Sequence, residues 1–388
     1  MSWHRCSPCF RRFDAALRTA AVIGSLAPGL LLPNVASLGC SARHGGDGCA
    51  ADAGIGVQHS AIFAGSQQSG YLMLDATMAD SIALVRFSAP GLQILCSGFL
   101  VRPQWVLTAG HCIGGAQGST AVTFAAVPGG VATVMPVQQV ILHPMLDVAL
   151  LGLGADATGV SPLVLFDGDA NAFAGTIAEI AGFGRTETGD RGELRFAVET
   201  IRRISATTLT GESVSGSGSC DGDSGGPMMV RDDTGFPVVI GLLWEGSQGC
   251  NQTDTYIRTD ALRGWVSESV GMLATPNTGC GAIASEGSCF SGVAVWCDAR
   301  GVRQASRCGA PSRCGWSSAA QGYRCVTNDS CEGIDLRGAC TTATEARYCE
   351  AGELVATDCG ACGGKCVVSG TDAVARCETT TGGGAQAL

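Results

Sequence analysis

One short stretch decides how the rest of this chain is interpreted: Ser219-Cys220-Asp221-Gly222-Asp223-Ser224-Gly225-Gly226-Pro227. It places a serine among glycines that let the backbone turn sharply, close to a cysteine that can form a disulfide. In such a turn the amides of Gly222 and Ser224 can point at one spot, where an acyl oxygen would gain negative charge, as in an oxyanion hole. An ordinary surface turn has a similar composition, so the stretch predicts a nucleophile only together with catalytic partners.

Two upstream segments supply candidate partners for Ser224. His111 follows the apolar, strand-like run that begins at Trp105, where a rigid sheet can hold an imidazole that takes the serine proton. Asp147 is the single acid of the largely apolar stretch 143–151, and a buried carboxylate needs a donor to offset its desolvation. The ring N–H of His111 is the natural donor. The three residues therefore predict a Ser/His/Asp triad.

In their order and flanking residues, the three motifs resemble those of the chymotrypsin/trypsin family of serine proteases. The order His111, Asp147, Ser224 separates this family from subtilisins and α/β-hydrolases. The resemblance covers residues 62–272. It implies an endopeptidase that hydrolyses proteins or peptides through an acyl-enzyme, without metal or organic cofactor. It also implies two packed Greek-key β-barrels with the catalytic cleft between them, and a C-terminal helix.

The same resemblance implies two disulfides and a substrate pocket. Cys96 is expected to pair with Cys112, next to the catalytic histidine, and Cys220 with Cys250, beside the pocket. The pocket is expected to involve four further residues: Gly218, Trp244, Gly246 and Asp254.

Two of these pocket residues bear on specificity, and a third bears on the mechanism. Gly218 stands where trypsins carry an acid at the pocket floor, which argues against ordinary binding of Arg and Lys side chains. Asp254 stands near the other wall, where it either restores a preference for basic residues or shapes a small, elastase-like pocket; both alternatives stay open. Trp244 takes the apparent place of the family serine that contacts the catalytic aspartate. This departure concerns the orientation of Asp147 and the edge on which a peptide docks.

The resemblance also implies an activation step. In the family, cleavage releases an N-terminal ammonium that inserts beside the acid preceding the nucleophile, here Asp223, and orders the oxyanion hole. Ile62 is the expected new terminus because it begins an apolar segment with glycine at the fourth position, and 55–57 is a rival start. No Arg or Lys precedes Ile62, so the cleavage would not be tryptic. Without cleavage Asp223 needs another partner, because an unpaired buried carboxylate is costly.

Length and composition indicate several domains of an all-β class. The 388 residues exceed what one core usually holds, and 57 glycines with only 15% charged residues suit short strands and many turns. About ten short apolar runs between residues 82 and 243 predict the strands of the two barrels. The net charge of −10 argues against nucleic acid as a partner.

The N-terminal region predicts export. Residues 1–39 combine arginines, an apolar run and small residues in the pattern of a bacterial-type signal peptide. Cleavage before Cys40 would resemble lipoprotein processing and leave a lipid anchor on that cysteine, with ordinary signal cleavage nearby as the equal alternative. Residues 40–61 resemble a linker or pro-segment. The 21 cysteines indicate an oxidising compartment, so a secreted or outer-surface location is expected.

The C-terminal region predicts two tandem cysteine-rich modules, residues 273–327 and 328–388, the second ending in a flexible tail. Six cysteines recur at an offset of 51 or 52: Cys280, Cys289, Cys297, Cys308, Cys314 and Cys325, then Cys331, Cys340, Cys349, Cys359, Cys366 and Cys377. Each module is too small to fold on a core alone, so three disulfides each are expected, with the pairing open. A zinc site at Cys359 and Cys362 is the weaker alternative, because the first module lacks the second of these cysteines.

Two functions of the modules are compatible with the sequence: attachment to a cell-surface or wall ligand, and an inert spacer. For the whole chain, the rival to the protease is a catalytically silent trypsin-fold protein that binds or adheres through its cysteine-rich repeats. The intact set of triad residues favours the enzyme.

Overall fold

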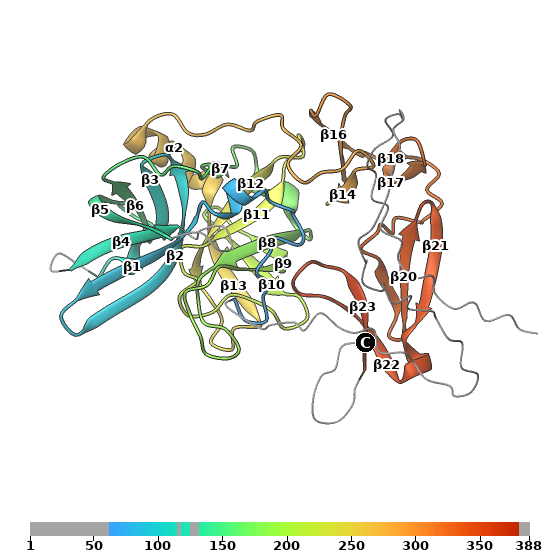
Figure 1. Ribbon diagram of the computed structural model, residues 1–388, viewed down its shortest axis with the longest axis horizontal. Helices are drawn as coiled ribbons and strands as arrows, with labels where there is room; N and C mark the ends of the chain where they lie inside the picture. The colour runs from blue at the N-terminus through green and yellow to red at the C-terminus, as the bar shows by residue number, and fades with distance from the viewer. Residues whose placement is uncertain (1–61, 115–117, 125–131, 380–388) are drawn as a thin grey trace, which may run out of the picture. The chain divides into compact units, whose positions relative to one another are not determined.

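The computed structural model describes residues 62–114, 118–124 and 132–379 (Figure 1). The expected signal peptide, the candidate lipid site at Cys40, the segment 40–61 and the end of the C-terminal tail lie outside these residues. Within the described ranges, no helix combines the length and apolar character needed to cross a membrane.

Six antiparallel strands form the first barrel, which closes in the order β1-β2-β3-β6-β5-β4. The strands are β1 Ile82–Ala89, β2 Leu92–Arg102, β3 Trp105–Ala109, β4 Ser119–Phe124, β5 Thr133–Leu142 and β6 Val148–Leu153. All six residues of β6 are buried, because an uninterrupted run of apolar residues and glycine can face protein on both sides. The pairing of β3 with β6 brings the ends of two distant segments together.

The second barrel is a sheet in the order β11-β8-β9-β10-β13-β12-β7, closed by an additional pairing of β11 with β12. Its strands are β7 Val164–Leu165, β8 Ile177–Gly182, β9 Arg195–Ile204, β10 Thr208–Ser213, β11 Pro227–Arg231, β12 Pro237–Glu245 and β13 Thr253–Arg258.

The helices are α1 Ala76–Ala79 and α2 Thr259–Val270, with short 3-10 turns η1 Gly110–Cys112, η2 Ala170–Phe173 and η3 Cys359–Cys362. Leu262, Val266 and Val270 form the buried stripe of α2, at the spacing of one helix face.

Four small sheets follow the second barrel. The first pair is β14 Ser288–Phe290, β15 Val293–Cys297 and β16 Arg303–Arg307, then β17 Arg313–Ser318 and β18 Gly322–Val326. The second pair is β19 Ala339–Thr342, β20 Glu345–Glu350 and β21 Glu353–Asp358, then β22 Gly364–Val368 and β23 Ala375–Thr379. A three-stranded sheet followed by a hairpin thus occurs twice.

The disulfides follow one pairing order in both cysteine sets. They join Cys280–Cys297, Cys289–Cys314 and Cys308–Cys325, then Cys331–Cys349, Cys340–Cys366 and Cys359–Cys377. In each set the first cysteine pairs with the third, the second with the fifth and the fourth with the sixth. Cys359 is bonded to Cys377, so the thiolate that the alternative zinc site required is absent.

The fold class expected from the sequence is confirmed: the chain is all-β, with two barrels, a helix after them and a disulfide-rich C-terminal region. Strands β7 and β10 were not predicted. The hydrophobic core of the barrels extends to Phe290, Val293 and Val295 of the C-terminal sheets, so these sheets pack on the protease body.

Candidate active site

Two hydrogen bonds tie the side chain of Asp147 to His111. His111 lies in η1, directly after β3, and Asp147 lies in the turn that leads into β6, the partner of β3. Asp147 Oδ2 is 2.6 Å from His111 Nδ1, and Asp147 Oδ1 accepts the main-chain N–H of His111 at 2.7 Å. A Cβ on Gly110 would lie 2.6 Å from Asp147 Oδ1, so this approach requires glycine. A carboxylate at this place keeps the proton of the neutral imidazole on Nδ1, so Nε2 is free to accept a proton.

A second histidine, which the sequence analysis did not identify, fixes the turn that carries Asp147. His143 Nδ1 accepts the main-chain N–H groups of Met145 at 3.1 Å and Leu146 at 2.9 Å. The ring of His143 also meets Trp265 of α2 edge-on, with 4.8 Å between ring centroids. Burial lowers the pKa of His143, which favours the neutral ring that these two bonds need.

Ser224 belongs to the loop before β11, and strand β2 of the other barrel holds this loop. The N–H of Ser97 donates to Ser224 O at 2.9 Å, and the Ser97 hydroxyl donates to Gly222 O at 3.0 Å. Gly225 has a φ of 84°, and a Cβ there would lie 2.3 Å from both Ser97 O and Thr108 Oγ1. Only glycine permits this approach, so the loop from the second barrel rests on the first.

The backbone of this loop presents two N–H groups, those of Gly222 and Ser224, in two successive turns. Gly222 has a φ of 101°, and the preceding carbonyl, Asp221 O, accepts the N–H of Arg185 at 2.8 Å. Among the described residues, neither the N–H of Gly222 nor that of Ser224 donates to an acceptor. Unpaired main-chain donors of this kind can bind a negatively charged oxygen.

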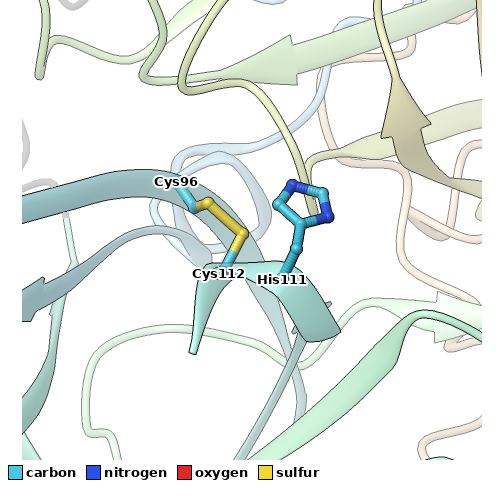
Figure 2. A group of neighbouring side chains, drawn as sticks. All are labelled: Cys96, His111 and Cys112. Carbon is cyan, nitrogen blue, oxygen red and sulfur yellow. A yellow bond between two sulfur atoms is a disulfide. The ribbon is translucent and has the colours of Figure 1, made fainter. Parts of the chain in front are cut away.

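A disulfide connects the histidine segment with strand β2, the strand that holds the serine loop. Cys96 and Cys112 are bonded, and the disulfide lies beside His111 (Figure 2). Cys112 Sγ is 3.7 Å from Ser224 O, whereas no hydrogen bond joins the Ser224 hydroxyl to His111 within the described ranges. Ligand atoms of these two cysteines and the histidine cluster closely enough for a metal ion. Sulfurs bonded to one another offer no thiolate, so this cluster is not a metal site.

Asp223 is buried under the loop, and no residue of the described part of the chain forms an ion pair with it. Its Oδ1 accepts the N–H of Gly184 at 2.7 Å and its Oδ2 that of Cys220 at 2.8 Å. Burial raises the pKa of Asp223 to about 7, although both backbone hydrogen bonds act in the opposite direction. Ile62 lines the same small cavity as Asp223, so the structure brings the two residues of the expected activation pair together.

The segment that begins at Ile62 is also joined to the expected pocket. Phe63 and Gly218 exchange two backbone hydrogen bonds, of 3.0 and 3.1 Å. The disulfide between Cys220 and Cys250 lies just beyond Gly218 along the chain and links the two segments on which the pocket residues lie.

Asp254 is completely buried between those two segments. Its Oδ2 accepts the N–H of Ser219 at 3.0 Å, and its Oδ1 accepts that of Ser247 at 2.8 Å. A Cβ on Gly246 would lie 2.8 Å from Ser219 Oγ, which shows how closely the segments approach. The carboxylate of Asp254 therefore clamps the two walls of the expected pocket.

A second buried acid, Glu199 of β9, lies against Asp254 and was missed in the sequence. Its Oε2 accepts the hydroxyl of Tyr256 at 2.9 Å, and its Oε1 has no hydrogen-bond partner in the described ranges. Burial, followed by the nearby charge of Asp254, raises the pKa of Glu199 well above 4.5. Glu199 is therefore held in its protonated form. The available signal was an acid at an inward position of an apolar strand.

Trp244 lies at an irregularity of β12. Leu243 pairs with Tyr256 and Glu245 with Thr255, so Trp244 is the extra residue of a β-bulge. Its side chain is 39% exposed, whereas Leu243 is buried. The indole consequently belongs to the surface beside the expected peptide-docking edge, and Leu243 fills the interior.

Comparison with known proteins agrees with this geometry. Residues 76–266 match the protein family described as Trypsin. The chain is similar to Trypsin 5G1 of Aedes aegypti, with 30% identity over 48% of this chain and 80% of that protein. It is also similar to the CLIP domain-containing serine protease HP8 of Bombyx mori, with 27% identity over 48% of this chain and 64% of that protein.

Among solved structures, that of HL collagenase is 25% identical, with a TM-score of 0.45, covering 53% of this chain and 99% of that chain. The chain spans less than two thirds of HP8 but four fifths of Trypsin 5G1. From the matched residues, the likeness to Trypsin 5G1 and the barrels that carry His111, Asp147 and Ser224, we conclude that the chain belongs to the trypsin family of serine proteases.

Proposed function

We propose that this protein is an exported serine endopeptidase. Two observations together carry the proposal. His111 is bonded to Asp147 on the first barrel, and the N–H groups of Gly222 and Ser224 in the serine loop have no acceptor in the part of the chain that the structure describes. A family fold maintained only for binding would not require those donors to stay unpaired.

In the proposed reaction, Ser224 Oγ attacks the peptide carbonyl while His111 Nε2 takes its proton. Asp147 holds the imidazole and stabilises the imidazolium. The N–H groups of Gly222 and Ser224 bind the oxyanion of the tetrahedral intermediate. His111 then returns the proton to the leaving amine, and water hydrolyses the acyl-enzyme by the same sequence of steps.

We infer that the substrate pocket accepts a small, uncharged side chain. Both oxygens of Asp254 already accept backbone N–H groups, and the walls at Gly246 and Ser219 lie too close together for a long basic side chain to reach the carboxylate. Gly218 contributes no charge, and exposed Trp244 would contact the substrate backbone. A peptide-library profile tests this inference: preference for Arg or Lys, abolished by Asp254→Asn, would overturn it.

The proposal includes activation by cleavage before Ile62. The new ammonium would enter the cavity that Ile62 and Asp223 share and would neutralise the buried carboxyl. N-terminal sequencing of the mature protein tests this step.

The remaining parts of the proposal rest on the sequence pattern. They are a signal peptide at 1–39, a linker or pro-segment at 40–61, a protease domain at 62–272 and tandem modules at 273–327 and 328–388. The common disulfide order of the modules supports their origin as a repeat. A cell-surface or wall ligand for the modules, and a bacterial-type export route, complete the proposal.

Labelling with a fluorophosphonate tests the catalytic assignment. Correctly processed protein should form a covalent adduct on Ser224, and Ser224→Ala should form none. His111→Ala should retain the serine but label far more slowly, by at least about a hundredfold, because the general base is lost. Processed protein that labels no faster than His111→Ala would refute the proposal.

A further inference from the structure

The loop that joins β22 to β23 in the second cysteine-rich module contacts the protease domain through its carbonyl groups. Gly370 O accepts two hydrogen bonds of 2.8 Å, from the N–H of Val198 in β9 and from the hydroxyl of Ser217. Two residues earlier, Val368 O accepts the hydroxyl of Ser215. The hairpin of β22 and β23 that carries this loop is drawn in red in Figure 1.

The fit between this loop and the protease domain is tight. A Cβ on Gly370 would lie 1.8 Å from Ser217 Oγ and 2.2 Å from Val214 O. The loop has internal support, since the N–H of Ser369 donates to Val374 O at 2.8 Å and Ala373 is buried in the main hydrophobic core. It is therefore a formed structural element whose shape matches its docking position.

The element that it contacts leads directly into the catalytic loop. Val214 and Ser217 close a turn by a bridge, and Ser217 immediately precedes Gly218. Gly218 pairs with Phe63, and the chain then continues through Ser219 to the nucleophile. A movement of this turn would consequently reach the N–H donors of the oxyanion hole along a few residues of backbone.

The two modules are also fixed to one another and to the protease domain elsewhere. Arg337 of the second module lies 5.0 Å from the ring centroids of both Phe290, in the first module, and Tyr71, in the protease domain. Tyr71 and Phe290 meet edge-on, with 6.0 Å between centroids. A module held at both ends in this way can restrain the turn that its loop touches.

We propose that the second cysteine-rich module is part of the catalytic unit, and that Gly370 and Ser217 are positioning residues for the loop that carries Ser224. This inference rests on the proposed endopeptidase activity. The docked loop stabilises the conformation of the Val214–Ser217 turn in which the serine loop is ordered. The contact favours this conformation over others of the turn. Its loss therefore lowers the fraction of molecules that are competent for acylation.

The test compares Gly370→Ala with Gly309→Ala in the full-length, disulfide-bonded protein. Gly309 is a matched control, since it lies in the cysteine-rich region and a Cβ there would meet nothing within 4 Å. We expect Gly370→Ala to lower the fluorophosphonate labelling rate of Ser224 by about tenfold or more, and Gly309→Ala to change it less than about twofold. Ser217→Ala should act in the same direction, and Ser217→Thr should restore much of the rate.

Amide hydrogen exchange supplies a readout that does not depend on activity. Gly370→Ala should accelerate exchange in residues 213–226 by about tenfold, with exchange in the first-barrel strands β2 and β3 unchanged. Equal labelling and equal exchange in Gly370→Ala and Gly309→Ala would overturn the inference. If wild-type protein does not label at all, the proposed activity fails, and the exchange comparison still decides the positioning role. If Gly370→Ala does not fold, Ser217→Ala and Ser217→Thr decide it.

Discussion

The ionisation of Asp223 should make the uncleaved protein less stable as the pH rises. This carboxyl is buried, accepts two backbone N–H groups and has a pKa of about 7 instead of 3.8. Because its folded pKa is raised, the native state binds the proton more tightly than the unfolded state. The associated stability is fully present below pH 3.8 and is lost as the pH rises towards about 7.

The magnitude follows from the difference between the two pKa values. Complete ionisation of Asp223 costs roughly 4 kcal/mol of folding free energy, of which about 3 kcal/mol falls between about pH 5 and pH 8. Asp223→Asn cannot ionise, so it should lack this part of the pH dependence. It should be less stable at about pH 5 by roughly 1–2 kcal/mol, because the amide accepts only one of the two N–H groups.

Urea unfolding followed by tryptophan fluorescence, with the disulfides intact, measures these differences. Asp156→Asn is the control, because Asp156 is exposed and should leave the wild-type pH dependence unchanged. Cleavage before Ile62 should abolish the loss at high pH, since an ammonium would then neutralise Asp223 in the shared cavity. Identical pH dependences for the uncleaved wild type and Asp223→Asn would refute the reasoning.

Three further changes have definite expected outcomes. Gly110→Ala should lower kcat by at least about a hundredfold, measured with a peptide substrate. The added Cβ would lie only 2.6 Å from Asp147 Oδ1 and would displace that carboxylate, so an unchanged kcat would contradict the role of the contact. His143→Ala should lower kcat by about tenfold and leave KM nearly unchanged, because it frees the turn that carries Asp147; a change in KM alone would contradict this. The free energy of unfolding of Glu199→Gln should equal that of the wild type within about 1 kcal/mol at pH 6, because glutamine resembles the protonated acid beside Asp254. Urea unfolding should show that the variant loses less stability than the wild type between about pH 6 and pH 9, and a steeper loss in the variant would contradict the protonated state.

The parts of the fold and site that the sequence predicted depend on local patterns. The all-apolar run of β6 and the alternating strands of both barrels need only neighbouring residues to be recognised. The stretch around Ser224 contains its own turn glycines, so its conformation is encoded locally. By contrast, β10 carries Thr, Gly, Glu and Ser with Leu209 as its single apolar residue, and it forms because β9 and β13 flank it.

The parts that were missed depend on contacts between distant segments. Glu199 acquires its significance from Asp254 and Tyr256, more than fifty residues away in the sequence. The bulge at Trp244 arises from the register in which β12 pairs with β13, and the sequence of β12 alone does not predict that register. The docking of Gly370 on Ser217 joins residues 153 positions apart, and a glycine in a hairpin loop gives no sign of its partner.

Ser97 of the first barrel holds the Ser224 loop of the second, and this contact affects when the folding chain becomes active. The serine and its donors lie on the second barrel, and Ser97 of the first barrel supplies two of the hydrogen bonds that hold their loop. A nascent chain in which only the first barrel has folded therefore has the base, His111, but no positioned nucleophile. We expect hydrolytic activity to arise only with the last step of folding, after both barrels have docked. Partially folded molecules would then pass through synthesis and transport without damaging their surroundings.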